Sequence, residues 1–547
     1  MNLSPQNRTR VISAGLGLLF TALVGKGGFI ALSGSGDVPE QRPIVQAGEP
    51  IRGDIVDRNG ELLATSVSAY SLYADPSAIW DAGDVVRELA TVFPDLDVAA
   101  LTMRLSNRER SFEWVKRGLT PRQRQVVFEL GLEGLGFREE SRRAYPRGTL
   151  AGHVLGYAGR DGNGLAGIEY AMDDQLKAGR EPVRLTIDNG LQAAIEAELS
   201  AAAAVHSIKG GAAILLDARS GEVRAMASWP PVSPYKARQL PSDDAAKLNR
   251  ATNAVYELGS VFKPLTVAAA IEAGVVMPDD VIDVRNGLTI EGKEIEDDHP
   301  IWGDADLTQI IAHSSNVGTV KVNMMLGLRR QKAFLESLGL FERSPVELAG
   351  SAAPLLPKKW DDLTAATVSY GHGIAVTPMA FISAFSALGN GGERVTPTLI
   401  MTDAKRPKPE RVMSALTAGM INTMMRYAVV DGTGRQAEVA GYGVAGKTGT
   451  AEKPTAGGYD EDRNITSFAT IFPYDRPQYA LIVTLDEPQM AEEAGAVGGA
   501  TAAWNAAPTA GRIIERVAPL MGLAPRFEEA RPVNVPIRSV SYERSAL

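Results

Sequence analysis

The stretch GYGVAGKTGTAEKP, residues 441–454, decides between two folds, because it fits one pattern if a helix follows Lys447 and another if a strand follows. Gly441, four further residues and then Gly446-Lys447-Thr448 spell a P-loop. A P-loop binds phosphate because its lysine stands at the N-terminus of a helix, where free N–H groups and the helix dipole attract anions. The residues that follow must therefore be able to form a helix.

They do not favour one. Gly449 follows at once, and Pro454 and a Gly-Gly pair at 457–458 come soon after, which disfavours a helix of useful length. The acidic stretch ALIVTLDE (480–487) would complete a P-loop site, but it pairs most simply with residues 466–475 as a hairpin. P-loop folds need parallel strands joined by helices. An ATPase is therefore rejected, and the segment is expected to be an extended edge strand.

An edge strand of this composition can hold an extended peptide. Its small residues, Gly449 among them, let another backbone lie alongside and pair with it. Lys447 offers a cation, and Thr448 and Thr450 offer hydroxyl groups, so the strand can bind the terminal carboxylate of a peptide. Such a strand should be accompanied by Ser-x-x-Lys and Ser-x-Asn motifs.

Ser-x-x-Lys occurs twice. In WPPVSPYKAR the prolines break any helix, so Ser233 and Lys236 would not share a face. In GSVFKPLTVAAAIEAGV a long apolar helix begins at the motif, and Ser260 and Lys263 would be neighbours on it. Burial and the nearby cation of Lys447 would lower the pKa of Lys263, which could then act as general base on Ser260. The alternative is that Ser260 is a helix N-cap and Lys263 lies on the surface.

Ser-x-Asn occurs once, as Ser314-Ser315-Asn316. The Ser314 hydroxyl can relay a proton to a leaving amine, and the Asn316 amide can hold a substrate carbonyl. The alternative is a polar turn before a helix, and His313 is interpreted as a structural histidine. Each motif is common by itself, whereas the three in this order within one region indicate an active site.

Composition excludes several classes of protein. The chain has 547 residues, a net charge of −9 and no cysteine, so two folded regions are expected and a basic nucleic-acid face, disulfides and thiolate metal sites are not. Its five histidines have no metal-ligand spacing such as His-Glu-x-x-His. No metal and no cofactor are therefore expected.

The N-terminus predicts a membrane anchor. Residues 11–32 are apolar and would be about 33 Å long as a helix, and Arg8 and Arg10 before them favour a cytoplasmic N-terminus. Lys26 is unusual in such a helix, but it lies toward the outer end, from which it can reach the interface. The alternative is a cleaved signal peptide with its apolar region at 11–25. In both cases the residues from about 33 onward lie outside the cytoplasm.

The fold class predicted for the rest is α+β. Hairpins in AAILLDARSGEVRAMAS, turning at Ser220-Gly221, and around Arg476-Pro477 enclose Ala-rich helical stretches, which indicates an antiparallel sheet flanked by helices. Gly162-x-Gly164-x-x-Gly167 spells a dinucleotide fingerprint but is better interpreted as turn glycines before a helix. The expected segments are cytoplasmic residues 1–10, a transmembrane anchor at 11–32, a linker at 33–50, a mixed α/β domain at 51–181, a domain that carries the three motifs at 182–520 and a C-terminal tail at 521–547.

With these motifs the chain resembles the class B penicillin-binding proteins, over nearly its whole length. RGDIVDRNGELLA and SRRAYPRGTLAGHVLGYAG resemble the non-catalytic pedestal, and GSVFKP, SSNVG, SYGHGIAVTP and GKTGTAEK resemble successive signatures of the transpeptidase domain. SYGHGIAVTPMAF and the short segment before KTGT are more similar to the cell-division (FtsI-type) enzymes than to the elongation type. Leu258 before Gly-Ser, where proline is frequent, and PPVSPY at 230–235 depart from the family pattern.

The resemblance implies a peptidoglycan D,D-transpeptidase that cross-links stem peptides at the division septum and is acylated by beta-lactams. It implies the following roles: Ser260 as nucleophile, Lys263 as base, Ser314 as proton relay, Asn316 for substrate orientation, Lys447, Thr448, Gly449 and Thr450 for the substrate carboxylate, and the backbone N–H groups of Ser260 and Thr450 as oxyanion hole. It also implies a single-pass protein of the bacterial inner membrane with a periplasmic catalytic domain, beside an FtsW-type lipid II polymerase. An elongation-type enzyme, a D,D-carboxypeptidase, a serine beta-lactamase, and a non-enzymatic beta-lactam sensor or division scaffold are the alternatives.

Overall fold

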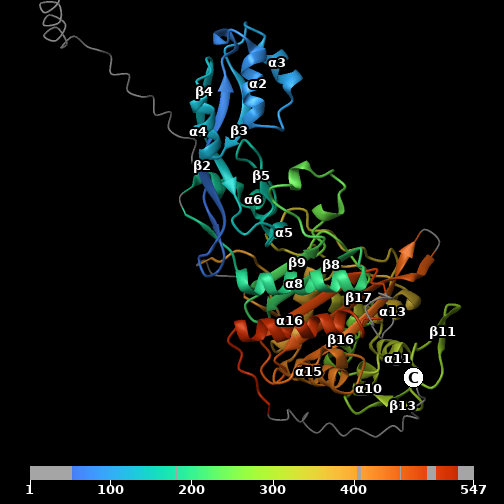
Figure 1. The fold of residues 1–547 in the computed structure, drawn as a ribbon. Coiled ribbons are helices and arrows are strands. Elements are labelled where there is room, and N and C mark those ends of the chain that lie inside the picture. Colours follow the sequence, from blue (N-terminus) through green and yellow to red (C-terminus); the bar gives the residue numbers. More distant parts are fainter. Residues whose placement is uncertain (1–51, 180, 403–407, 456–457, 490–499, 528–547) are drawn as a thin grey trace, which may run out of the picture. The chain divides into compact units, whose positions relative to one another are not determined.

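A five-stranded antiparallel sheet forms the centre of the catalytic region (Figure 1). The computed structural model describes residues 52–179, 181–402, 408–455, 458–489 and 500–527. The strands in spatial order are β16 (Ala445–Thr455), β17 (Gly458–Phe472), β18 (Tyr479–Asp486), β8 (Gly210–Asp217) and β9 (Val223–Trp229). Every neighbouring pair is antiparallel. The predicted antiparallel sheet and its two hairpins are confirmed, and the strand that carries Lys447 lies at the edge of the sheet.

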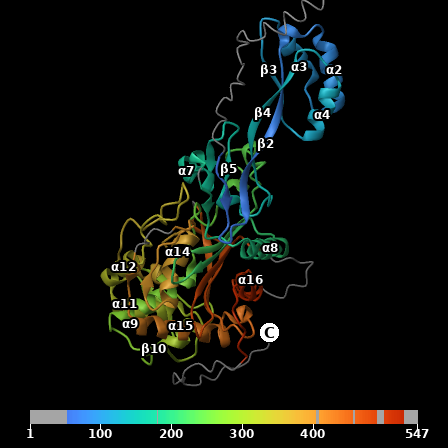
Figure 2. The same ribbon diagram turned by 90° about the vertical axis from the view of Figure 1, so that its left-hand side faces the viewer.

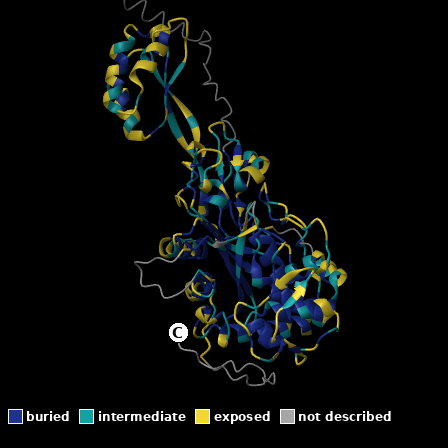
Figure 3. Ribbon diagram, turned by 90° about the vertical axis from the view of Figure 1, so that its right-hand side faces the viewer, coloured by how far each residue is buried: buried dark blue, intermediate teal, exposed yellow. Residues whose placement is uncertain are grey.

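The sheet separates two apolar cores because successive side chains of a strand face opposite sides. On β8, Ala213 and Leu215 belong to the core beneath α8 and α16, whereas Ile214 and Leu216 belong to the core shared with α9, α14 and α15. Figure 2 shows these two groups of helices on opposite sides of the sheet, and Figure 3 shows buried residues throughout it. Every strand of the sheet is therefore held in register from both faces.

The catalytic region contains nine α-helices among the described residues. They are α8 (Asn189–His206), α9 (Lys263–Glu272), α10 (Leu307–Ala312), α11 (Asn316–Leu326), α12 (Leu328–Ser337), α13 (Asp362–Ser369), α14 (Pro378–Ser386), α15 (Ala415–Val430) and α16 (Ala506–Leu520). Helix α8 begins at an aspartate cap, since the Asp188 carboxylate accepts hydrogen bonds from the N–H groups of Gly190 and Leu191. Three short pairs of strands lie in the connections: β10 (Val281–Asp283) with β13 (Asp304–Asp306), β11 (Leu288–Ile290) with β12 (Lys293–Ile295), and β14 (Glu393–Arg394) with β15 (Glu410–Arg411).

The N-terminal region is built on a mixed sheet. Its strands are β1 (Ile55–Val56), β2 (Leu62–Ala74), β3 (Glu113–Leu119), β4 (Leu135–Ala144) and β7 (Val183–Arg184), of which only β1 and β7 are parallel. A turn at Asn59-Gly60 joins β1 to β2, with Gly60 at φ +86°. Helices α2 (Ala82–Val92), α3 (Val98–Leu105) and α4 (Pro121–Glu129) share a core with β2 and β3.

β7 is only two residues long. The strand ends at Arg184 because the chain leaves the N-terminal sheet just after it. The Leu185 N–H still donates to the Val56 carbonyl, whereas the Thr186 N–H donates to the Leu399 carbonyl at 2.8 Å. β7 thus pairs with the first strand of the N-terminal sheet before the chain enters the catalytic region. The boundary that the sequence predicts at 181/182 lies directly before this strand.

The glycines of the dinucleotide-like spelling are turn glycines, as expected. Gly162 and Gly167 have φ values of +76° and +59°, and β6 (Gly164–Ala166) and α6 (Gly167–Ala171) follow one another there. A Cβ on Gly164 would lie 1.8 Å from the carbonyl oxygen of Glu169. The backbone therefore packs against itself at the place where a dinucleotide phosphate would have to bind. The small elements α5 (Gly152–Leu155), β5 (Tyr157–Ala158) and α7 (Asp173–Ala178) complete this part of the chain.

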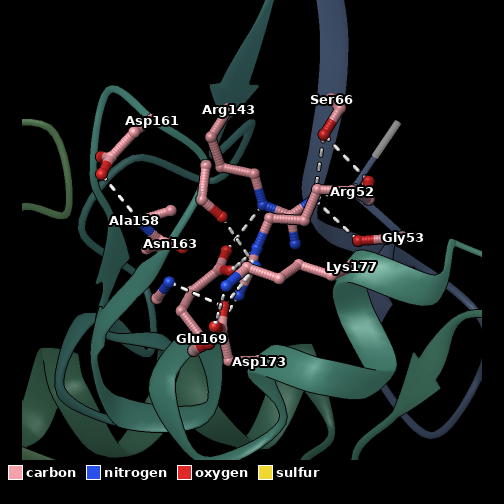
Figure 4. A network of polar contacts seen from close by, with 12 residues as sticks. Arg52, Gly53, Ser66, Arg143, Ala158, Asp161, Asn163, Glu169, Asp173 and Lys177 are labelled. Carbon is pink, nitrogen blue, oxygen red and sulfur yellow. Dashed lines mark hydrogen bonds and ion pairs between the residues drawn. The ribbon is translucent and has the colours of Figure 1, made fainter. Parts of the chain in front are cut away.

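A buried ion-pair network joins distant segments of the N-terminal region (Figure 4). The Glu169 carboxylate has no exposed surface and receives Arg52 Nε and Arg143 Nε, each at 2.6 Å. Arg52 Nη1 also lies 2.6 Å from Asp173 Oδ1, and Lys177 pairs with the other oxygen of Asp173 at 2.6 Å. The network therefore ties the start of the N-terminal sheet to β4 and to helices α6 and α7.

The predicted cytoplasmic residues, anchor and linker (1–50) lie outside the described residues. Within the part of the chain that the structure describes, no helix is both long and apolar enough to cross a membrane. The expected C-terminal tail is described up to residue 527, and there Arg526 N–H donates to the Gly441 carbonyl at 2.7 Å while its guanidinium pairs with Asp475 at 2.7 Å.

Glu169→Gln should destabilise the N-terminal region strongly. The substitution leaves two guanidinium groups, 6% and 7% exposed, without the charge between them, and breaking a buried pair in this way costs about 3–5 kcal/mol. Chemical denaturation followed by circular dichroism measures the change. Asp84→Asn, in an exposed pair with Arg87, is the control and should cost less than about 1 kcal/mol. Equal losses for the two variants would contradict the structural role of the network.

Candidate active site

Ser260 stands on a tight turn ahead of a buried helix. Residues Gly259–Phe262 form a 3-10 turn, and α9 continues directly from Lys263, so the sequence prediction of one continuous α-helix through both residues is only partly right. In a 3-10 turn residues i and i+3 align along the axis. Val261 and Phe262 are buried in the apolar core and fix the turn, whereas Ser260 remains partly exposed.

Two glycines let three segments meet at this turn. Gly259 has φ +62°, and a Cβ on it would lie 2.5 Å from the carbonyl oxygen of Thr450 on β16. A Cβ on Gly449 would lie 2.3 Å from the carbonyl oxygen of Leu258. From the other side the Gly371 carbonyl accepts the Gly259 N–H at 3.3 Å. The edge strand thus touches the backbone next to Ser260, at a distance only glycine permits.

Lys263 is buried completely, and its amine contacts Ser314 and Asn316 of the Ser-x-Asn motif. Its side chain has no exposed surface. The Nζ atom lies 2.7 Å from Asn316 Oδ1 and 3.1 Å from Ser314 Oγ, and it also contacts the Ser314 carbonyl oxygen. The alternative reading, with Lys263 on the surface, is therefore wrong. No hydrogen bond joins the Ser260 hydroxyl to this amine among the described residues.

Ser314 lies in a strained connection between α10 and α11. It has φ +63°, which is uncommon for a residue other than glycine. The adjacent Ser315 caps α11, its Oγ accepting the Gly318 N–H at 2.9 Å. This conformation turns both the carbonyl and the hydroxyl of Ser314 toward Lys263.

Asp297 holds this connection in place, and sequence analysis missed it. Its carboxylate accepts hydrogen bonds from Ser315 Oγ at 2.7 Å, from the Val317 N–H at 2.9 Å and from the Asn316 N–H. An anion at the N-terminus of α11 satisfies its free N–H groups and interacts favourably with the helix dipole. The neighbouring Glu296 carbonyl accepts Asn316 Nδ2 at 3.0 Å. The only sequence signal is the adjacent acids Asp297 and Asp298 in EIEDDHP (294–300). Nothing in their distance along the chain links them to the Ser-x-Asn motif.

Lys447 faces the same side of the sheet as the core around α9. It is completely buried, and its Nζ lies 3.1 Å from the Thr448 carbonyl oxygen and 3.3 Å from Thr448 Oγ1. The Thr448 hydroxyl meets that of Thr433, a residue that sequence analysis did not single out, at 2.7 Å. Thr450 Oγ1 accepts the Ala502 N–H at 3.1 Å. Lys447 is thus close enough to Lys263 for the charge of Lys263 to act on its ammonium group.

Burial lowers the pKa of both lysines. It brings the pKa of Lys263 to about 7, although the nearby carboxylates of Asp297 and Asp298 oppose the shift. Burial, together with the charge of Lys263, holds the pKa of Lys447 well below its ordinary value. The sequence predicted that burial and the charge of Lys447 would lower the pKa of Lys263; burial is the main cause, and Lys447 is not among the causes of the shift. At neutral pH a large fraction of Lys263 is therefore an amine with a lone pair.

The structure thus brings the three motifs together: Ser260 and Lys263, Ser314 and Asn316, and Lys447 through Thr450. The second Ser-x-x-Lys does not join them: Ser233 and Lys236 lie in a turn in which the Lys236 N–H donates to the Ser233 carbonyl, and Lys236 is exposed. Within the described residues no group of three or more acidic or histidine side chains could hold a metal ion.

Comparisons with known proteins match both regions. A family model described as the penicillin binding protein transpeptidase domain matches residues 211–506, and one described as the penicillin-binding protein dimerisation domain matches residues 47–209. The chain belongs to the penicillin-binding protein family. Its dimerisation-type region places it with the class B members, in which no glycosyltransferase region accompanies the transpeptidase.

Individual relatives show which members of the family the chain is similar to. The chain is 39% identical over 505 residues to the probable peptidoglycan D,D-transpeptidase FtsI of Caulobacter vibrioides, which covers 90% of this chain and 85% of that protein. It is 31% identical over 516 residues to the peptidoglycan D,D-transpeptidase FtsI of Escherichia coli, covering 88% and 85%. The crystal structure of penicillin binding protein 3 from Mycobacterium tuberculosis complexed with aztreonam matches with a TM-score of 0.69 and 28% identity, over 87% of this chain and 98% of that one.

Asp297→Asn should slow labelling of the protein by a fluorescent penicillin by about tenfold or more. The amide cannot accept from all the donors that now fix Ser314–Asn316, and losing a charged hydrogen bond costs about 1.5–3 kcal/mol. Asp298→Asn is a matched control, because the Asp298 charge also acts on Lys263 but this exposed carboxylate makes no hydrogen bond among the described residues. Its labelling should stay within about threefold of wild type. A similar loss in both variants would show that charge, and not the capping geometry, is responsible.

Proposed function

We propose that Ser260 is the nucleophile of a division-type peptidoglycan D,D-transpeptidase and that Lys263 is its general base. The observation that carries this proposal is the complete burial of Lys263, three residues after a partly exposed serine, with its Nζ 3.1 Å from Ser314 Oγ and 2.7 Å from Asn316 Oδ1. Burial lowers the pKa of the Lys263 amine to about 7, so a large fraction of it is neutral at that pH, which is the form that can accept a proton.

The first half-reaction transfers the acyl group of the donor peptide to the enzyme. Lys263 Nζ takes the Ser260 hydroxyl proton while Ser260 Oγ attacks the carbonyl carbon of the penultimate D-alanine. The backbone N–H groups of Ser260 and Thr450 stabilise the oxyanion. When the peptide C–N bond breaks, the proton passes from Lys263 through the Ser314 hydroxyl to the leaving amine of D-alanine. The hydroxyl can take part because it is both a donor and an acceptor.

The second half-reaction reverses these proton movements. The neutral amine of a neighbouring stem peptide attacks the ester carbonyl, Lys263 takes the proton that the new amide nitrogen loses, and Ser260 Oγ recovers it as the C–O bond breaks. A cross-link forms and the enzyme returns to its starting state. A beta-lactam stops after the first half-reaction, because its leaving nitrogen stays attached to the acyl group.

The hydroxyl groups of Thr448 and Thr450 bind the terminal carboxylate of the donor, and the buried ammonium of Lys447, whose Nζ lies 3.3 Å from Thr448 Oγ1, attracts it through its charge. The Lys447 amine is held at a low pKa by burial and by Lys263, so in the free enzyme the two lysines do not both carry a full charge. A carboxylate beside Lys447 stabilises its ammonium form, while Lys263 stays neutral. Donor binding therefore prepares the base. Gly449 lets β16 lie against the Ser260 turn and Asn316 orients the donor carbonyl.

The remaining parts of the chain anchor the protein in the membrane and bind its partner proteins. Residues 11–32 anchor the protein in the inner membrane with residues 1–10 in the cytoplasm, and 33–50 link the anchor to the periplasmic domains. The pedestal at 51–181 and the anchor contact an FtsW-type lipid II polymerase at the septum, and 182–520 carry the catalysis. The net charge of −9 and the extracytoplasmic location are consistent with the absence of a nucleic-acid partner.

Labelling with a fluorescent penicillin tests this function. The wild-type protein and Ser233→Ala should be labelled covalently, because Ser233 lies in a turn outside the site. Ser260→Ala should not be labelled, and Lys263→Ala should lose at least about two orders of magnitude in rate, the usual contribution of a general base. Labelling that persists in Ser260→Ala would falsify the assignment.

A further inference from the structure

A carboxylate three residues before the nucleophile has no role in the chemistry above. Glu257 is partly buried, and burial raises the pKa of its carboxyl against the hydrogen bonds that it accepts from Tyr459 and from the Gly373 backbone. The Tyr459 hydroxyl lies 3.1 Å and 3.3 Å from the two carboxylate oxygens. Three residues of chain span at most about 11 Å, so Glu257 lies beside the Ser260 turn.

No cation neutralises Glu257 within the described part of the chain. Lys293 acts on its charge from a distance, but the ammonium of Lys293 lies over the Tyr459 ring, 5.9 Å from the centroid, and forms no ion pair with Glu257. His372, whose ring is 5.7 Å from that of Tyr459, does not supply a charge either, since burial lowers its pKa to about 4. A half-buried carboxylate with neutral donors around it and space for solvent on one side suits an external ammonium group.

The position of Glu257 along β16 indicates which part of a substrate would reach it. Tyr459 is opposite Pro454 in the β16–β17 register, which is seven residues and about 24 Å along the strand from Lys447. Thr450 lies between the two. The residue before D-alanyl-D-alanine does not follow the strand as far as Pro454, because two residues of chain extend at most about 7 Å beyond the terminal carboxylate. Its side-chain amine can instead reach Glu257, which lies within about 11 Å of Ser260 and to which the Tyr459 side chain extends.

We propose that Glu257, assisted by Tyr459, binds a primary ammonium group of the stem peptide, namely the side-chain amine of the diamino residue that precedes D-alanyl-D-alanine in the donor. This inference rests on the proposed orientation of the donor along β16. It gives the site opposite charges at its two ends: Lys447 for the carboxylate of the donor and Glu257 for its amine. The acceptor amine is the other ammonium source with the same chemistry, and the two sources act in different half-reactions.

Two synthetic donors separate these sources. Both end in D-alanyl-D-alanine; one has lysine before it and the other has Nε-acetyl-lysine, which carries no charge. With full-length wild-type protein, release of D-alanine should be at least about tenfold faster, as kcat/KM, from the lysine peptide. In Glu257→Gln this preference should fall to about twofold or less, and Tyr459→Phe should reduce it partially. The control is Glu294→Gln, which removes an exposed carboxylate on β12, next to Lys293, and should leave the preference unchanged.

A second measurement tests whether Glu257 binds the amine of the acceptor instead. With one donor fixed, the ratio of transfer to glycinamide over hydrolysis is compared between wild type and Glu257→Gln. A loss confined to this ratio assigns the ammonium site to the acceptor and overturns the donor assignment. If neither the donor preference nor the ratio changes, Glu257 binds no ammonium and the proposal is wrong.

Benzylpenicillin, whose side chain carries no ammonium, separates this proposal from the proposed function. Glu257→Gln should be labelled by it at nearly the wild-type rate. If the wild type itself is not labelled, the proposed function fails; if only Glu257→Gln loses labelling, Glu257 supports the nucleophile turn and the ammonium proposal is overturned.

Discussion

The site depends on keeping lysine side chains out of water. Lys263 and Lys447 have no exposed surface, and a buried ammonium is unfavourable unless its charge is compensated. Around Lys263 the compensation is partial: neutral acceptors from Ser314 and Asn316, and two carboxylates, Asp297 and Asp298, that act from a distance. The result is an amine that titrates near neutral pH and can exchange protons with its neighbours.

Burial of this kind requires that distant parts of the chain meet without gaps. The edge strand β16 reaches the Ser260 turn because Gly449 and Gly259 have no side chains to separate them. The apolar cores on the two sides of the sheet hold that strand and α9 in fixed positions. The 315–317 segment is fixed by Asp297, which comes from a different connection. Rigid elements therefore set the distances, and the reacting groups lie on short, strained links between them.

The sequence was sufficient to predict the parts that follow from local rules. Glycine and proline after Lys447 excluded a helix, and turn residues between apolar stretches predicted the hairpins. The position of Ser260 and Lys263 at the start of an apolar run placed them together. The roles of Asp297, Thr433 and Glu257 could not be predicted in this way. Their partners are separated from them by between 15 and 202 residues in the chain, and an exposed acid in a polar loop has the same local pattern whether or not it caps a distant helix. The positive φ of Ser314 and the 3-10 turn at Ser260 also arise from packing of neighbouring elements and not from local preference.

The central claim is that burial makes Lys263 a base at neutral pH, and the pH dependence of the acylation rate tests it most directly. A base must be unprotonated, so the rate must increase as the pH passes the pKa of Lys263 from below. With a pKa of about 7, the second-order rate constant for acylation by benzylpenicillin should rise between about pH 6 and 8, with a midpoint near 7, and then level off. A rate that is still rising tenfold per pH unit at pH 9, as for a lysine with an ordinary pKa, would contradict the account.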